Sequence, residues 1–497
     1  MQRPLRQAAT LATRTLLPPA RQLTSLLLAG LTLIMLQVSP ANGAAHSTVA
    51  AGGAHSLALA EDGSVWAWGF NDQGQLGDGS LQFSTAPILV HGLPAIKAIS
   101  AGYTSSIALA QDGSVWTWGS NDSGELGDGT TNARHRPAKI QGLDQVTAIA
   151  MSAGTGMAVK ADGTLWLWGQ SSGTATSATH STLLAPVPVP SLSGVAGVGI
   201  GQTSLFAYTY DCALWAWGKN AFGQLGDGTT SAQPAPSRTN IQACLSGVAA
   251  NNHTLALSAT GDLWAWGYNH DGQLGNGTSR NTSSPALLPL PKNVAAIACD
   301  HHSLALRGDG SLWAWGQNDY GQLGDGTVAS RTEPLPIKGL SAVTSIAAGA
   351  MFSLAAKADG SVWAWGINTY GQLGDGSTDT HTSPVQVTGF EGLGFLNLKH
   401  PAGGDVSKTA QEIPPLSFSA TPTTGPAPLS VSFLVADDGA PPPVALHWDF
   451  GDGEVANSPA PQHIYVSPGN YIVTLTVNYR QEIFRESMKQ IVVTPGK

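Results

Sequence analysis

The sequence predicts an all-β protein in which a seven-bladed β-propeller is followed by a small C-terminal β-domain. Three observations support this fold class. A Trp-x-Trp-Gly tetrapeptide occurs seven times at a spacing of 49 or 50 residues and uses fourteen of the fifteen tryptophans. Each period contains four short stretches that favour strands, and no helical periodicity is found. Seven repeats of four strands are typical of a propeller in which each repeat forms one blade.

Within one repeat the expected strands are V-x-x-I-A, H-S-L-A-L, V-W-A-W and a segment after a proline. Asp-Gly pairs such as Asp62-Gly63 predict a hairpin between the second and third strands. The Gly-Gln-Leu-Gly-Asp-Gly segment predicts a longer loop, because its residues tolerate positive φ. Side chains i and i+2 of a strand point the same way, so both tryptophans of a pair are expected to pack against the neighbouring blade.

These copies resemble the repeats of the regulator of chromosome condensation family. The motifs A-G-x-x-H-S-L-A-L, W-G-x-N and G-Q-L-G-D-G recur in that order from about Thr48 to Lys399. The resemblance implies a seven-bladed propeller over residues 48–399. The third copy departs after Gly169, where it lacks N-x-x-G-Q-L-G. The sequence leaves open whether the first strand and the last segment, Phe395 to Leu398, complete one blade between them.

A second resemblance covers the C-terminal region. Residues 400–414 are predicted to be a polar linker, and residues 415–497 alternate like antiparallel strands. The run Trp448-Asp449-Phe450-Gly451-Asp452-Gly453, followed by His463-Ile464-Tyr465, resembles the polycystic kidney disease (PKD) domain. This resemblance implies a small immunoglobulin-like β-sandwich that serves as a spacer or adhesive module. The acidic run could hold calcium, but it is first of all a turn.

Residues 1–43 are predicted to be a signal peptide. Four arginines precede an apolar run from Leu23 to Val38, and small residues follow at Ala41-Asn42-Gly43. The run is short for a membrane span, although an uncleaved anchor is the alternative. The expected location is therefore outside the cell or at its surface, with no integral span after cleavage.

Charge argues against a nucleic-acid partner. Cleavage after residue 43 removes four arginines and leaves a net charge of −13 in place of −9. Nucleic-acid binding needs clustered positive charge, which an acidic exported protein lacks. The best-known member of the resembling family acts in the nucleus on chromatin and a small GTPase. We do not expect that role here, because a fold does not determine function.

Three cysteines occur in the chain. Counting strands places Cys212 and Cys244 on the same rim, so a disulfide between them is one expectation and two free thiols the other. Cys299 is expected to be a buried free thiol. Histidine recurs at one slot of the repeat, in His55, His253 and His302. A structural role is favoured over metal binding or catalysis, because residues from different blades need not converge.

No reaction can be assigned from the motifs. Loops such as Asn71 to Gly74 have oxygen-rich side chains but lack the D-x-D-x-D-G spacing of a calcium loop. Nucleophile elbows, phosphate loops and zinc-protease helices are missing from the sequence. We therefore predict a protein without catalytic residues, metal site or cofactor.

The repeat-to-repeat differences point to one rim as a partner-binding surface. Aromatic and arginine side chains often anchor protein interfaces. The alternative is that they fill slots typical of the repeat. The predicted rim residues are Phe70, Tyr103, Lys219, Phe222, Tyr268, His270, Asp300, His301, Tyr320, Tyr370, Arg134 and Arg331.

The resulting hypothesis is a secreted, monomeric, non-enzymatic protein that binds another macromolecule, expected to be a protein, through a propeller rim. A secreted bacterial β-lactamase inhibitory protein built from similar repeats is a precedent for such binding. One alternative is a secreted hydrolase acting on carbohydrate or peptide, which would need two or more carboxylates converging in a cleft. Another is a structural component of an envelope.

Overall fold

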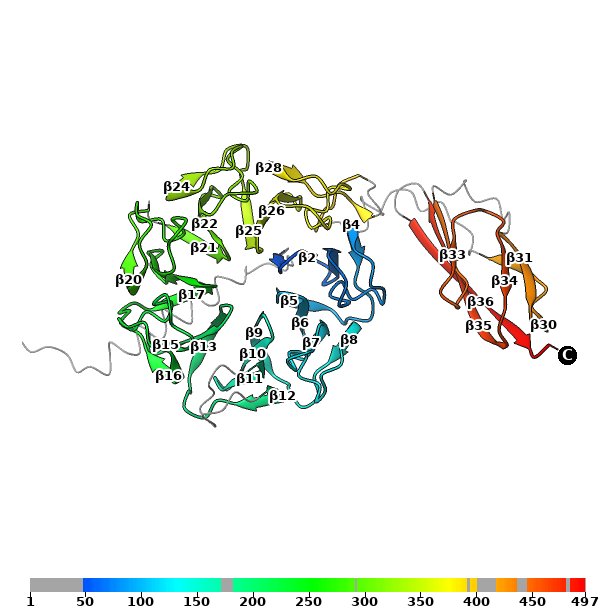
Figure 1. Cartoon of the computed structure of the whole chain (residues 1–497), viewed down its shortest axis with the longest axis horizontal. Coiled ribbons are helices and arrows are strands. Elements are labelled where there is room, and N and C mark those ends of the chain that lie inside the picture. The colour runs from blue at the N-terminus through cyan, green and yellow to red at the C-terminus, as the bar shows by residue number, and fades with distance from the viewer. Residues whose placement is uncertain are drawn as a thin grey trace, which may run out of the picture. The chain divides into compact units, whose positions relative to one another are not determined.

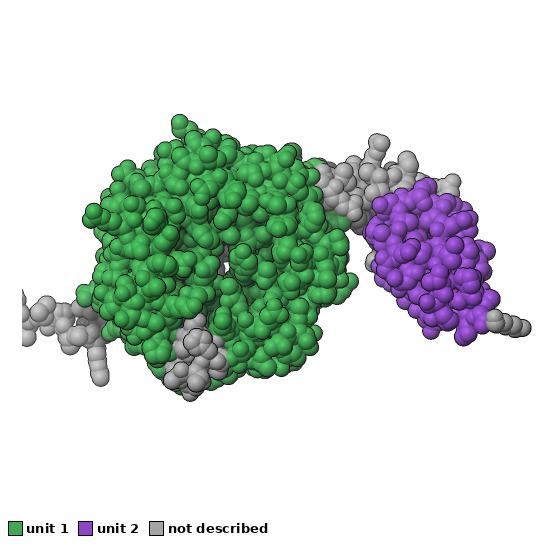
Figure 2. Space-filling model, in the orientation of Figure 1, with its two compact units in different colours: residues 1–399 green, residues 400–497 purple. Residues whose placement is uncertain are grey.

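The computed structural model describes residues 48–170, 182–290, 293–390, 394–399, 417–435, 445–479 and 483–496. The chain divides into two compact units after Lys399 (Figure 2). Every element of secondary structure in the described residues is a strand, as the predicted all-β class requires. The predicted signal peptide, the predicted linker and the divergent third outer loop (171–181) lie outside the described residues.

The first unit is a ring of seven four-stranded sheets (Figure 1), which confirms the predicted propeller. Each sheet is built from four consecutive antiparallel strands. Their bounds, blade by blade, are β1 (Thr48–Ala51), β2 (His55–Leu59), β3 (Val65–Gly69), β4 (Ser84–Leu89); β5 (Ile96–Ala101), β6 (Ser105–Ala110), β7 (Val115–Gly119), β8 (Arg134–Lys139); β9 (Val146–Ser152), β10 (Thr155–Lys160), β11 (Leu165–Gln170), β12 (Thr182–Pro188); β13 (Val195–Ile200), β14 (Ser204–Thr209), β15 (Leu214–Gly218), β16 (Gln233–Arg238); β17 (Leu245–Ala250), β18 (His253–Ser258), β19 (Leu263–Gly267), β20 (Thr282–Leu287); β21 (Val294–Cys299), β22 (His302–Arg307), β23 (Leu312–Gly316), β24 (Arg331–Pro336); and β25 (Val343–Ala348), β26 (Phe352–Lys357), β27 (Val362–Gly366), β28 (His381–Gln386).

The fourth strand of each blade differs from the expectation, because it contains the proline instead of following it. In the first blade Pro87 lies inside β4, between the pairs Ala67–Ile88 and Gly69–Ser84, where the register shifts. Proline has no N–H to donate, so it is tolerated at a bulge on an outer strand.

Among the described residues no sheet is shared between the two ends of the propeller, which answers the question that the sequence left open. β1 to β4 form one sheet and β25 to β28 another. The segment from Phe395 to Leu398 forms two isolated bridges, to Thr388 and Ser361. Leu396 and Leu398 are buried in the core between blades seven and one, and Glu61 N donates to Leu398 O at 2.9 Å.

The second tryptophan of each pair joins neighbouring blades. Trp118 is completely buried, and its Nε1 donates to the Gln75 carbonyl of the preceding blade at 2.8 Å. Trp68 closes the ring in the same way, through the Gln372 carbonyl at 2.9 Å. The first tryptophan is less buried than expected in six of the seven pairs. Trp116, for example, lies next to the hairpin, where its Nε1 donates to Ser114 Oγ at 3.1 Å.

The recurrent histidine is structural, as predicted. His55 is fully buried, and its Nε2 lies 3.0 Å from Ser106 Oγ of the next blade. Ser106 gives its proton to the Gln75 carbonyl at 2.9 Å, so its oxygen accepts from His55 Nε2–H. Burial lowers the pKa of His55 to about 3. His253 and His302 make the same contact, with Ser303 at 2.7 Å and Ser353 at 2.6 Å.

A disulfide joins Cys212 and Cys244 across the rim opposite the long loops, with their Cα atoms 4.2 Å apart. Cys212 stands in a hairpin position where other blades have glycine and adopts a φ of +64°. We expect the double substitution Cys212→Ser/Cys244→Ser to lower the free energy of unfolding by about 3–4 kcal/mol, because the bridge spans 32 residues. Denaturant unfolding measures this loss, with Cys299→Ser as control; equal stability would contradict the prediction.

The second unit contains two sheets, ordered β29–β31–β34 and β30–β36–β35–β32–β33. Trp448 and Phe433 are buried in its core, with ring centroids 5.5 Å apart. Asp449 Oδ1 accepts from Gly451 N at 2.9 Å, so the acidic motif forms a turn as expected. The strands are β29 (Phe418–Thr421), β30 (Thr424–Pro426), β31 (Leu429–Val435), β32 (Ala445–Asp449), β33 (Val455–Ala456), β34 (Gln462–Tyr465), β35 (Gly469–Tyr479) and β36 (Ile483–Thr494).

Candidate functional site

The loops that join first to second and third to fourth strands emerge at one end of the propeller. We call this end the loop rim; in the first blade it comprises residues 52–54 and 70–83. The loop of one blade also reaches over the next, since Gly376 N of blade seven donates to Thr85 O of blade one at 3.0 Å. Residues that are far apart in sequence therefore become neighbours across each boundary between blades.

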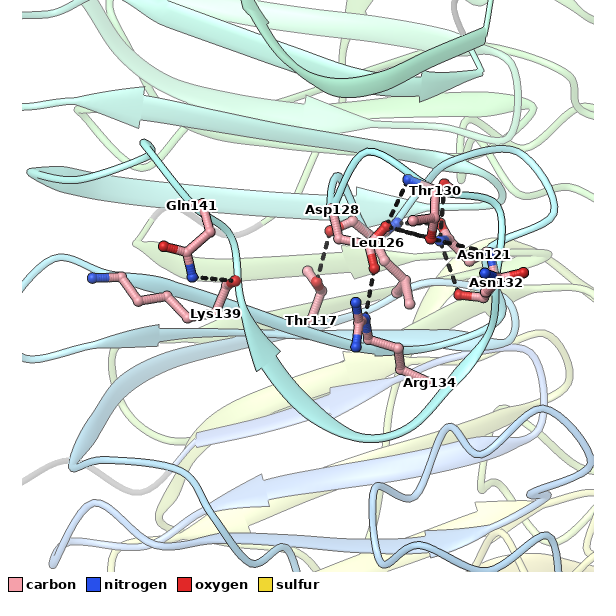
Figure 3. Close-up of polar contacts among 9 residues, drawn as sticks. All are labelled: Thr117, Asn121, Leu126, Asp128, Thr130, Asn132, Arg134, Lys139 and Gln141. Atoms are coloured by element: carbon pink, nitrogen blue, oxygen red, sulfur yellow. Dashed lines mark hydrogen bonds and ion pairs between the residues drawn. The ribbon is translucent and has the colours of Figure 1, made fainter.

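In six of the seven blades a buried asparagine fixes the shape of the long loop, as Figure 3 shows for blade two. Asn121 Nδ2 donates to the carbonyls of Thr130 at 3.1 Å and Asn132 at 3.0 Å, and its Oδ1 accepts from Leu126 N at 2.9 Å. The sequence did not single out this asparagine as the residue that holds the loop together. Its nearly constant spacing from the G-D-G-T segment was the available signal. Among the described residues no cluster of His, Cys, Asp or Glu could hold a metal ion. The same asparagine recurs at Asn71, Asn220, Asn269, Asn318 and Asn368.

Two of the predicted rim residues, Arg134 and Arg331, brace the loops of their own blades. Arg134 Nε lies 2.6 Å from Asp128 Oδ2 (Figure 3), and Arg331 Nη2 lies 2.7 Å from Asp325 Oδ2. Burial would raise the pKa of Asp128, but hydrogen bonds from Thr130 and Arg134 bring it below its ordinary value. These arginines are therefore already engaged in ion pairs.

Aromatic side chains meet in pairs across two blade boundaries. Phe70 and Tyr370 have ring centroids 4.7 Å apart across the boundary of blades one and seven. Phe222 and Tyr268 are 4.9 Å apart between blades four and five, and Tyr268 stacks with His270 at 6.1 Å. Lys219, on the same side of the ring as Phe222, is exposed. The structure thus splits the predicted aromatic residues into two separate groups.

The exposed apolar side chains of the loop rim are concentrated in blades six, seven, one and two. In the described loops of blades three to five no large apolar side chain is as exposed, since Phe222 and Tyr268 are half-buried. We call the exposed apolar residues of blades six, seven, one and two the apolar arc. Two of its members, Leu81 and Val328, were not singled out from the sequence. The arc consists of Leu81 (44% exposed), Phe83 (50%), Tyr103 (57%), Tyr320 (39%), Val328 (57%) and Tyr370 (41%).

The innermost strands line a channel of about 250 Å³, mostly with alanine, valine and isoleucine side chains. Cys299 is a free, half-buried thiol in this wall, and burial raises its pKa well above the ordinary value. At the loop rim the channel opens through a mouth of about 50 Å³, which Tyr103, Asp300 and His301 help to line. Among the described lining residues Asp300 is the one carboxylate, so the carboxylate pair expected of a hydrolase is not found there.

Asp300 and His301 form an ion pair at the mouth, through His301 Nδ1 and Asp300 Oδ1. A hydrogen bond with Asp300 raises the pKa of His301 above its ordinary value, although burial opposes the shift. The structure separates the twelve predicted rim residues. Three line the mouth, two others belong to the apolar arc, and Phe70 packs against that arc. Three form the group around Phe222, two make ion pairs within their loops, and Lys219 belongs to none of these sets.

Comparison with known proteins agrees with this architecture. The RCC1-like domain model matches residues 29–299, and the regulator of chromosome condensation (RCC1) repeat model matches residues 309–356 and 359–405. The PKD domain model matches residues 415–481. Protein RCC2 homolog of Danio rerio is 50% identical over 40 residues, which are 8% of this chain and 8% of that relative's length.

Two solved structures show the same propeller fold. Prp20p from Saccharomyces cerevisiae is 24% identical, with a TM-score of 0.58 over 65% of this chain and 86% of that chain. Human WBSCR16 is 23% identical, with a TM-score of 0.59 over 65% of this chain and 94% of that chain. The described residues include no apolar helix of membrane-spanning length. Since the RCC1-like model covers more than half of the sequence, the chain belongs to the RCC1 repeat family and carries a PKD domain after its propeller.

Proposed function

We propose that this protein is exported through its N-terminal segment and acts as a non-enzymatic binding protein. Its apolar arc would hold a partner protein, and the PKD domain would serve as a spacer or adhesive module. The basic and then apolar composition of residues 1–43 supports export. The acidic net charge supports a protein partner over a nucleic acid.

The observation that carries this proposal is the uneven distribution of exposed apolar side chains on the loop rim. The propeller needs its buried tryptophan in every blade, but nothing in the repeat requires Tyr103, Tyr320 or Tyr370 to be exposed. Their 39–57% exposure leaves apolar surface in water. Clustered exposed apolar residues mark interaction sites, and tyrosines often contribute a large share of the binding energy.

Other proteins of this fold support the class of function. Prp20p is described as having binding properties to Gsp1p and histones, and another structure shows Kap60 bound to yeast RCC1 (Prp20). These partners are those of the yeast protein, and the low identity transfers the fold alone. They support protein binding as a use of such propellers, while the partner of this chain has to be found by experiment.

We expect the triple variant Tyr103→Ala/Tyr320→Ala/Tyr370→Ala to weaken partner binding at least 30-fold, roughly 2 kcal/mol, because exposed tyrosines in an interface act as anchors. Residues 44–497 would first be used to isolate a partner from the surrounding medium. Binding of that partner would then be measured by calorimetry with wild-type and variant proteins. Thermal stability should change little, since these side chains are exposed.

A matched control removes apolar side chains away from the loop rim. Tyr210, Leu287 and Leu335 have comparable exposures of 47%, 55% and 38%, and none belongs to a loop of that rim. Their triple alanine variant should bind the partner like the wild type. Equal binding by the arc variant, or equal loss in both variants, would contradict the proposed surface.

A further inference from the structure

The mouth of the channel is a small pocket to which five blades contribute polar residues. They are Tyr103 from blade two, Ser152 from blade three, Gln202 from blade four, Asn251 from blade five, and Asp300 with His301 from blade six. Gly52 and Gly53 of blade one complete the wall. A Cβ atom at Gly53 would lie 2.9 Å from Cδ2 of Tyr103, so the aromatic ring rests directly on this glycine.

Several backbone donors around this pocket are already used. Gly52 N donates to His55 O at 2.9 Å, Asn251 N to His253 O at 2.9 Å, and Asp300 N to His302 O at 3.0 Å. Binding an anion would require free N–H groups directed at it, as in other anion sites. These three N–H groups cannot serve an anion, and the Asp300 carboxylate at the mouth would repel one.

Acceptors, in contrast, remain available. Asn251 is 4% exposed, and its Oδ1 accepts no hydrogen bond. His301 pairs with Oδ1 of Asp300, while Oδ2 has no recorded partner among the described residues. A buried acceptor without a partner is costly, so a ligand with several N–H donors would gain from entering. The buried, unsatisfied Oδ1 of Asn251 and the second oxygen of the Asp300 carboxylate favour a cationic, donor-rich group.

The size of the mouth and the ring of Tyr103 limit which cationic group can bind. The mouth has about 50 Å³ of space, whereas one water needs roughly 10–15 Å³ by the same kind of measure. It thus accepts a group of a few heavy atoms. A guanidinium is planar, carries five N–H donors and can stack on an aromatic ring, whereas an ammonium offers three donors around one point. Tyr103, at 57% exposure, supplies such a ring.

We infer that the channel mouth is a socket for the guanidinium group of an arginine. Asp300 Oδ2 and Asn251 Oδ1 accept its N–H groups, and Tyr103 stacks on its face. The source of the arginine rests on the proposed function: Tyr103 belongs both to the mouth and to the apolar arc, so a protein held by the arc can insert one arginine there. The socket itself does not depend on that partner.

The test titrates residues 44–497 with arginine amide. Citrulline amide, whose ureido side chain has a similar shape but no charge, and lysine amide, whose side chain is an ammonium, are the comparison ligands. We expect saturable binding of arginine amide, with both other ligands weaker by roughly tenfold or more. Asp300→Asn and Tyr103→Ala should each weaken arginine amide binding by a similar factor. Asp319→Asn, which removes another exposed carboxylate of the loop rim, is the matched control.

Melting temperatures of the variants show whether each remains folded. Absence of saturable binding, equal binding of citrulline amide, or unchanged binding by Asp300→Asn would each overturn the socket. The result is independent of the partner experiment, because arginine amide needs no partner protein. Suppose that the arc variant bound its partner normally and that the wild-type protein bound arginine amide as expected. The proposed partner surface would then be wrong, and the arginine socket would stand.

Discussion

Trp118→Ala is expected to lower the free energy of unfolding of the propeller by about 3–5 kcal/mol, the range for truncating a buried tryptophan. Trp118 is fully buried among Leu57, Leu59 and Leu76 of the preceding blade. Its removal opens a cavity between two blades and leaves the Gln75 carbonyl without its indole donor, although the Ser106 hydroxyl still donates there. Both effects fall on a boundary that holds the ring together.

Trp116→Ala in the same strand provides the matched control. Trp116 is half-buried and donates within its own hairpin, so its loss should cost clearly less. Trp118→Phe separates the two contributions of the buried ring, because it keeps aromatic packing and loses the Nε1 donor. Guanidinium unfolding followed by near-ultraviolet circular dichroism reports mainly on the propeller, which holds fourteen of the fifteen tryptophans. Equal losses for Trp118→Ala and Trp116→Ala would contradict the assigned role.

Lowering the pH from 7.5 to 5.5 is expected to destabilise the propeller by about 4 kcal/mol through three buried histidines. Burial lowers the pKa of His55, His253 and His302 to about 3, against 6.5 in the unfolded chain. The unfolded state therefore takes up protons below pH 6.5 while the folded state does not. Their stabilising contribution is complete above pH 6.5 and is lost as the pH falls toward 3.

One neighbouring group acts in the opposite direction. The pKa of His301 is raised by Asp300, so this residue favours the folded state as the pH falls and reduces the net loss. The variant His302→Phe isolates one buried histidine, because the same slot holds Phe352 in blade seven. Its stability should fall less steeply with pH than that of the wild type, by about 1.4 kcal/mol per pH unit. His270→Phe, at an exposed position, is the control; parallel curves for His302→Phe and wild type would contradict the assigned effect of burial.

Repetition explains why so much of the fold could be predicted. Trp68 and its six equivalents stand at a constant spacing, and one strand assignment then applies to every blade. The same topology places Cys212 and Cys244 on one rim, but it left open whether they form the disulfide that the structure shows. The predicted bounds of the outer strand were less accurate. β4 includes its proline at a bulge, which the alternation of apolar and polar residues does not reveal.

The rim was harder to predict because its neighbours come from different repeats. Phe70 and Tyr370 are separated by 300 residues in sequence and meet only because the loop of blade seven reaches over blade one. Subtracting the consensus identified both residues but could not pair them. It also grouped Arg331 with the aromatic residues, although its guanidinium is engaged by Asp325. The space at the mouth depends on six blades together and has no local sequence pattern.

The way the ring closes has a consequence for its genetics. Among the described residues no sheet is divided between the two ends of the propeller, so all seven sheets are whole and the boundary between blades seven and one is the one that the chain does not cross. A circularly permuted gene that linked residue 399 to residue 48 and opened the chain near residue 291 would still encode seven whole sheets. Duplication or deletion of one 49–50-residue unit would likewise preserve every sheet while changing the ring size.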